Sequence, residues 1–151
     1  MRAISIDKVR ILLEIPEMPT DLIQEALTVA GEDQKYPDGF KALAQLGTTC
    51  INTCFLEMGY KGSLRREINS DISTKYNSSV YRASVAKRNG IDHLIEYGKN
   101  GKETENNLAF AISALIATAY LTRGSEGLPL QANVLIPSFQ FSLQDLMVWG
   151  W

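Results

Sequence analysis

The feature that most constrains this chain is an apolar, alanine-rich run over residues 108–121. The run is about 14 residues long, shorter than the ~20 that a helix needs to span a bilayer. We expect it to lie in a helix from Thr104 or Glu105 to about Thr122 that is apolar almost all round, and such a helix belongs at the centre of a domain. Its alanines would keep it thin, so that neighbouring helices can approach closely. The sequence therefore predicts an all-α domain built around this segment.

Helical periodicity marks the rest of the chain as well. The first predicted helix ends before Pro16, and the second begins at Asp21 and ends at Gly31. The third runs from about Phe40 to Met58. The fourth begins at a Ser63 cap and continues past Ile72, and the fifth runs from Ser78 or Ser79 to Gly90. A polar loop is expected over residues 31–39, and a short turn is expected to open at Asp92. These boundaries follow from caps, glycines and prolines at the ends of apolar stripes.

A chain of 151 residues has the length of one domain. We expect residues 1–123 to form a single helical domain. Residues 124–151 form an apolar extension rich in aromatic and aliphatic side chains, which is expected to pack on the domain or on a dimer partner because so apolar a surface is rarely left in water. No repeat or second-domain linker is visible.

The net charge of −2 gives no global attraction to nucleic acid. Charged residues interrupt the first helix, so no apolar stretch typical of a secretory signal is present. We expect a soluble, intracellular protein that does not associate with a membrane. The two cysteines, Cys50 and Cys54, lie one helical turn apart and are expected to be buried free thiols.

Four segments occur in the order and spacing of a known family. Residues 21–28 read Asp-Leu-Ile-Gln-Glu-Ala-Leu-Thr and are followed by a polar loop. Residues 40–48 read Phe-Lys-Ala-Leu-Ala-Gln-Leu-Gly-Thr, residues 84–91 read Ser-Val-Ala-Lys-Arg-Asn-Gly-Ile, and residues 108–121 end in Ala-Tyr-Leu. Together these segments resemble the ribonuclease III catalytic domain over about residues 5–123. The resemblance implies a ribonuclease III-like helical bundle.

The resemblance also shows what this chain has lost. Active relatives hold Mg²⁺ with two carboxylates on the signature helix and two on the last helix, and the ion activates water for phosphodiester cleavage. The matching positions here carry no acid, and the first acidic position of the signature is a lysine. The resulting degenerate pocket consists of Lys41, Ala44, Thr48, Phe110 and Ser113. We therefore predict no catalytic residues, no metal ligands and no cofactor.

The function implied by the resemblance is that of a pseudoenzyme, an RNA-binding, RNA-processing or scaffolding domain without nuclease chemistry. Two alternatives remain open. The emptied pocket could serve a repurposed enzyme that acts on a small molecule, or displaced acids could sustain residual cleavage of double-stranded RNA. An enclosed apolar cavity at the pocket would favour the first alternative, and a filled core would not.

Two surfaces are predicted by the same reasoning. The basic residues that would contact the phosphates of double-stranded RNA, weakly and in a salt-sensitive way, are Lys61, Arg65, Arg66, Arg82, Lys87 and Arg88. The alternative is that they form a plain solvated face. Relatives dimerise through the signature helix, where this chain has Gln45 in place of the aromatic plug. We nevertheless predict a two-fold homodimer with Gln45, Thr49, Cys50 and Cys54 at its interface.

Overall fold

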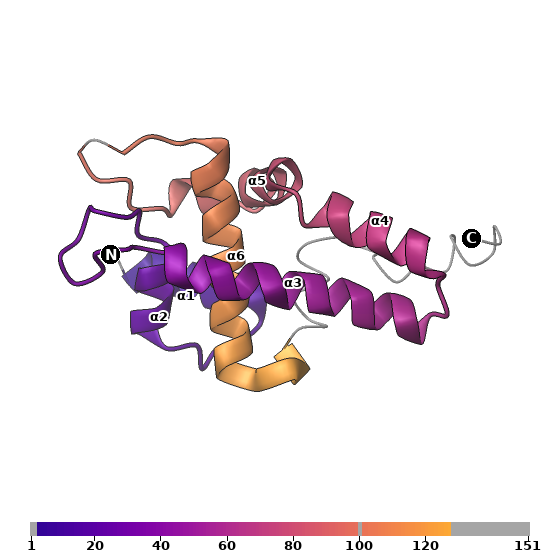
Figure 1. Ribbon diagram of the computed structural model, residues 1–151. Coiled ribbons are helices and arrows are strands. Elements are labelled where there is room, and N and C mark those ends of the chain that lie inside the picture. The colour runs from indigo at the N-terminus through magenta and orange to yellow at the C-terminus, as the bar shows by residue number, and fades with distance from the viewer. Residues whose placement is uncertain (1–2, 100, 128–151) are drawn as a thin grey trace.

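A computed structural model describes residues 3–99 and 101–127, and every regular element within these ranges is a helix (Figure 1). The elements are α1 (Ala3–Leu13), α2 (Thr20–Ala26), α3 (Lys41–Lys61), α4 (Arg66–Tyr76), α5 (Ser79–Arg88), η1 (Ile91–His93), α6 (Glu105–Arg123) and η2 (Gly124–Gly127). Two isolated bridges, Thr28 with Glu96 and Asp33 with Tyr36, are the only extended pairings there. The all-α fold class is confirmed. The extension beyond Gly127 lies outside the described residues.

Several helix ends are where their local sequence predicts them. The Ser78 side chain caps α5 by accepting a hydrogen bond from the Tyr81 amide at 3.2 Å, and Thr104 caps α6 by accepting from the Asn107 amide at 3.1 Å. Gly90 follows α5 with a φ of 73°, a left-handed conformation that glycine adopts without steric cost. These ends are encoded locally, because the cap and its partner lie within one turn.

Other predicted boundaries were wrong. Ser63 does not cap the fourth helix, because it takes a φ of 60° just after α3, and α4 begins three residues later at Arg66. The second helix ends at Ala26 rather than near Gly31. The chain leaves the helix there because the Val29 amide donates to the Glu96 carbonyl at 3.1 Å, a contact with a distant segment. Helix α2 also begins at Thr20, with Asp21 inside its first turn.

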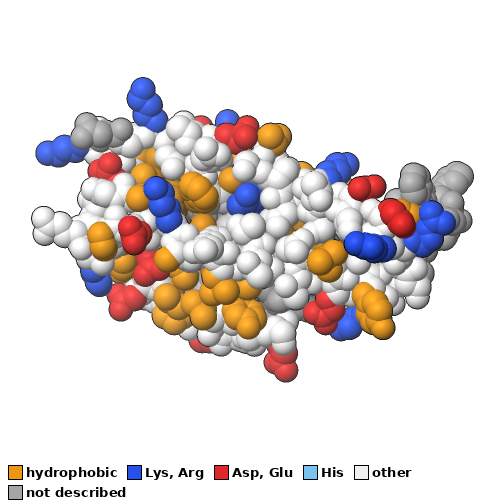
Figure 2. All heavy atoms as spheres, viewed as in Figure 1, with side chains coloured by type: hydrophobic (Ala, Val, Ile, Leu, Met, Phe, Trp, Pro, Cys, Tyr) orange, Lys and Arg blue, Asp and Glu red, His pale blue; other side chains and the backbone are white. Residues whose placement is uncertain are grey.

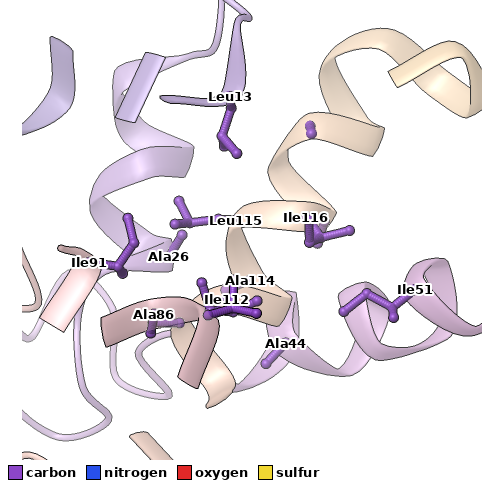
Figure 3. Close-up of a cluster of buried hydrophobic side chains, with 14 of the residues drawn as sticks. Leu13, Ala26, Ala44, Ile51, Ala86, Ile91, Ile112, Ala114, Leu115 and Ile116 are labelled. Carbon is purple, nitrogen blue, oxygen red and sulfur yellow. The ribbon is translucent and has the colours of Figure 1, made fainter. Parts of the chain in front are cut away.

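The core is organised around α6, which crosses α3 in Figure 1 and contacts α5 on another side. From Leu108 to Ala119, every residue of α6 except Phe110 is buried. Figure 3 shows Ile112 of α6 close to Ala44 of α3 and Ala86 of α5, and Leu115 of α6 close to Ala26 of α2. The central position expected for the alanine-rich helix is therefore confirmed.

Helices α3 and α6 approach each other closely in the core. A Cβ atom placed on Gly47 would lie 1.6 Å from the carbonyl oxygen of Ser113, far inside van der Waals contact. Only a residue without a side chain permits this crossing. Gly47 thus sets the distance at which two segments distant in sequence face each other, and these segments carry the residues of the degenerate pocket.

Helix α6 is also long and apolar enough, by composition, to cross a membrane over Glu105–Glu126, and it is the one described helix that meets this criterion. In this fold 61% of that window is buried inside the protein. Central helices of water-soluble bundles have the same composition. The apolar character of α6 is accounted for by its place in the core.

Candidate functional site

The α3–α6 crossing brings together four of the five residues of the degenerate pocket. Ala44 and Thr48 lie one turn apart on α3, and Phe110 and Ser113 lie one turn apart on α6. The Thr48 Oγ1 atom lies 3.3 Å from the Ser113 Oγ atom and donates a hydrogen bond to it. Lys41, at the start of α3, has an exposed side chain. The two helices thus face each other at the positions that the family resemblance singled out.

The side chains at this crossing fill the space against one another. Ser113 is 0% exposed and Ala44 is 1% exposed. The ring of Phe110 packs against Phe40, with 5.7 Å between the ring centroids. This packing is that of a filled core, and it does not favour the small-molecule site that an emptied pocket would offer.

Arg82 reaches this crossing from α5. Its Nη1 atom donates hydrogen bonds to the Ser113 Oγ atom and, at 3.3 Å, to the Ala109 carbonyl of α6. Its Nε atom donates to the Asn77 carbonyl at 3.1 Å. Only 8% of Arg82 is exposed, and burial lowers the pKa of its guanidinium. Because an arginine pKa starts above about 12, the group stays charged at neutral pH.

Among the described residues, the positive charge of Arg82 has only neutral hydrogen-bond acceptors. Within residues 3–99 and 101–127, no ion pair joins it to a carboxylate, and its three acceptors are neutral oxygens. Removing a cation from water without a counterion costs several kcal/mol. Hydrogen bonds from a charged donor, about 1.5–3 kcal/mol each, offset part of this cost.

Asn77 extends the hydrogen bonding to α3. It follows α4, and its Nδ2 atom donates to the Thr48 carbonyl at 3.1 Å while its own carbonyl accepts from Arg82. Its Oδ1 atom is buried without a hydrogen-bond partner. We call Thr48, Asn77, Arg82 and Ser113 the Arg82 network. It connects α3, the α4–α5 junction and α6 around one buried cation.

Sequence reasoning placed Arg82 among the residues that contact RNA, and that assignment was wrong, because the side chain points into the core. The signal that could have located it is helical spacing. Val85 and Ala86, both 0% exposed, follow Arg82 by three and four residues, which puts all three on one face of α5. An arginine on an apolar face predicts a buried guanidinium.

The other basic residues predicted to contact RNA lie at the surface in two groups. Arg65 and Arg66 are exposed at the start of α4, near Lys61, whose ammonium pairs with Glu57 at 2.8 Å. Lys87 and Arg88 are exposed at the end of α5, where Lys87 pairs with Glu103 at 3.8 Å. Figure 2 shows Lys and Arg side chains interspersed with Asp and Glu over the face in view. The contact of these residues with RNA stays a prediction.

The predicted dimer residues divide by exposure. Gln45 and Thr49 are exposed on α3, whereas Cys50 and Cys54 are buried free thiols, as their spacing predicted. Burial raises the pKa of the Cys50 thiol, and burial with the nearby Glu57 charge raises that of Cys54 to about 11. A dimer interface along this helix would therefore use Gln45 and Thr49, and the homodimer itself stays a prediction.

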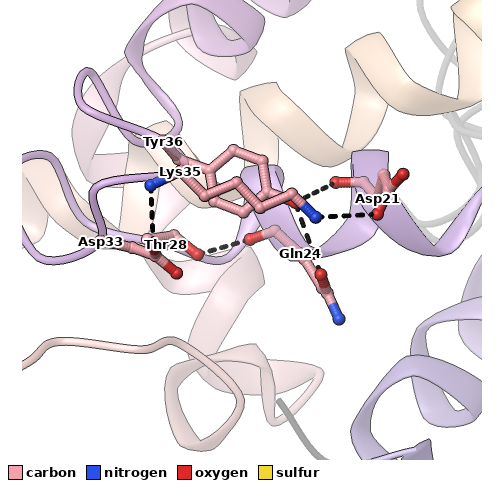
Figure 4. Close-up of polar contacts among 6 residues, drawn as sticks. All are labelled: Asp21, Gln24, Thr28, Asp33, Lys35 and Tyr36. Atoms are coloured by element: carbon pink, nitrogen blue, oxygen red, sulfur yellow. Dashed lines mark hydrogen bonds and ion pairs between the residues drawn. The ribbon is translucent and has the colours of Figure 1, made fainter.

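A second polar cluster connects α2 with the loop after it (Figure 4). The Lys35 ammonium lies 3.4 Å from Asp21, and the Tyr36 hydroxyl donates to Gln24 at the same distance. A hollow of about 230 Å³ beside this cluster is lined by Glu32, Asp33 and Glu96, among others. Over the part of the chain that the structure describes, no three acidic, histidine or cysteine side chains are grouped as metal ligands.

No family model matches this chain, and no curated protein matches it.

Proposed function

We propose that this chain is a catalytically silent ribonuclease III-like domain that acts by binding, as an RNA-binding or scaffolding domain. The observation that supports the proposal is the Arg82 guanidinium at the α3–α6 crossing. It donates a hydrogen bond to Ser113, a position at which the resemblance implies a carboxylate ligand for Mg²⁺. A permanent cation stands where active relatives gather negative charge.

The electrostatics of the crossing oppose a divalent ion. A +2 ion about 4 Å from a guanidinium is repelled by roughly 8 kcal/mol at an effective dielectric constant near 20. The oxygens nearby are hydroxyls of Thr48 and Ser113 and neutral carbonyls, whereas Mg²⁺ is held mainly by carboxylates and substrate phosphates. An ion at this place would find a like charge and no anionic ligand.

Cleavage is tested with the purified full chain, duplex RNA, and Mg²⁺ or Mn²⁺. We expect no product above a mock preparation. The matched control is Arg82→Leu, since a contaminating nuclease would be indifferent to this substitution. The proposal would be overturned by a metal-dependent cleavage activity that co-purifies with the protein and that is altered in the Arg82→Leu variant.

Binding is tested by electrophoretic mobility shift of duplex RNA at two salt concentrations. The double variant Arg65→Ala/Arg66→Ala removes two exposed cations, and we expect weaker binding with the salt slope reduced by about 2. The control, Lys8→Ala/Lys99→Ala, removes the same charge from other exposed sites. A control that weakens binding equally would show nonspecific attraction, and no shift at low salt would leave scaffolding alone.

A further inference from the structure

Helix α1 carries an apolar stripe that no described residue covers. Ile4 and Ile11 lie two turns apart on one face and are 68% and 76% exposed. Ile11 also lines a groove of about 480 Å³ together with Asp7, Arg10, Glu14 and Pro16. Large aliphatic side chains aligned on one helix face, beside a groove, form a surface suited to an apolar occupant.

The end of α6 is held beside this groove. Arg123 makes two hydrogen bonds to Glu17, from Nε to Oε1 at 2.5 Å and from Nη2 to Oε2 at 3.1 Å. Glu17 directly follows Pro16, a groove residue. The described chain ends at Gly127, a few residues beyond Arg123. The last described helix is therefore tied, four residues before the described chain ends, to the segment that borders the groove.

The composition of residues 139–151 matches an apolar groove. The segment has one charged residue, Asp145, and its apolar side chains are Phe139, Phe141, Leu143, Leu146, Met147, Val148, Trp149 and Trp151. Residues 128–138, about 11 in number, can span at most roughly 40 Å. Helix α1 has 11 residues and is about 16 Å long. The connection is long enough to reach any part of the groove.

We propose that residues 139–151 dock in the groove along α1 of their own chain. The attachment at Gly127 gives them an effective concentration of roughly millimolar at the groove, above that of a second copy in dilute solution. The exposed stripe and the apolar segment then complete one core. This inference is independent of the proposed function.

The test uses tryptophan fluorescence, because Trp149 and Trp151 are the only tryptophans in the chain. In the unsubstituted chain we expect a blue-shifted emission maximum and slow quenching by acrylamide. The variant Ile11→Glu should shift the emission to the red and increase the quenching constant several-fold. The matched control is Val80→Glu on α5, another aliphatic residue that is 67% exposed, which should leave both unchanged.

Circular dichroism establishes that the Ile11→Glu protein keeps its helices, and Ile4→Glu provides a second variant on the same stripe. The proposal would be overturned if the unsubstituted protein had the emission maximum of tryptophan exposed to water. It would also be overturned if the emission spectrum of Ile11→Glu were identical to that of Val80→Glu. A blue shift that disappears on dilution would also overturn it, because the occupant would then be the segment of a second copy.

Discussion

The Arg82 network makes a prediction about which property of the buried arginine stabilises the fold. Replacing Arg82 by methionine removes the charge but keeps a flexible apolar side chain that replaces the stem of the arginine, at a position that is 8% exposed. Replacing it by alanine removes the charge and the volume together. Comparing the two variants separates the contribution of the guanidinium from that of packing.

The magnitudes follow from the contacts. Both variants lose three hydrogen bonds, but the Ala109 carbonyl lies within α6, and Ser113 still accepts from Thr48 at 3.3 Å. Leaving an acceptor unsatisfied costs about 1–3 kcal/mol, and relief of the buried charge offsets much of this. We expect Arg82→Met to lower the free energy of unfolding by less than about 1.5 kcal/mol. Arg82→Ala adds a cavity and should lower it by about 3 kcal/mol.

The assay is urea denaturation followed by far-ultraviolet circular dichroism. With a slope of roughly 1–3 kcal/mol per molar urea, a loss of 3 kcal/mol moves the midpoint by about 1.5 M, provided that the slope is unchanged. If methionine destabilises as much as alanine, the guanidinium hydrogen bonds outweigh the cost of burying the charge. The reasoning about an uncompensated cation would then be refuted.

Two further predictions concern α3. Gly47→Ala places a Cβ atom 1.6 Å from the Ser113 carbonyl oxygen, so the helices must separate, and we expect the free energy of unfolding to fall by more than about 4 kcal/mol. In the control, Gly90→Ala, the new Cβ atom meets no atom within 4 Å, and the free energy of unfolding should fall by about 1 kcal/mol. Both values are measured by urea denaturation. A loss for Gly47→Ala as small as that for Gly90→Ala would mean that the two helices do not approach each other closely at this residue. The pKa of Cys54 is raised from 9.0 to about 11 in the folded chain, so the unfolded chain releases its proton first, and stability should fall by about 3 kcal/mol as pH rises from 9.0 to about 11. Cys54→Ala should make the fall over this range shallower by about that amount, while Tyr97, whose pKa burial raises to about 12, still contributes above pH 10. An unchanged profile would contradict the burial of the thiol.

Much of the fold was predictable because its signals are local. The caps of α5 and α6 are side chains bonded to amides within one turn. The burial of α6 follows from a composition that leaves no polar face to contact water. Gly47 lies in a segment that carried the family resemblance, but its partner, the Ser113 carbonyl, is supplied by another helix.

Prediction of the candidate site was less complete. The sequence identified Ala44, Thr48, Phe110 and Ser113 through a resemblance, and the structure places them at one crossing. Arg82 was assigned to the surface, because arginine is rarely buried and composition alone does not show which side of a helix meets the core. The ends of α2 and α3 also differ from expectation, since the Glu96 carbonyl and a left-handed Ser63 decide them.

A family resemblance singled out the positions of the degenerate pocket, which carry no acids in this sequence. The amino-acid sequence by itself determined that this chain forms helices and which of them lies at the centre. These properties depend on residue type and on spacings of three or four residues. Only the tertiary structure decided that the Arg82 guanidinium lies at the α3–α6 crossing. The physical reason is that Arg82 contributes its charge from α5, whereas its acceptors belong to the junction with α4 and to α6, and only packing brings these segments within hydrogen-bond distance.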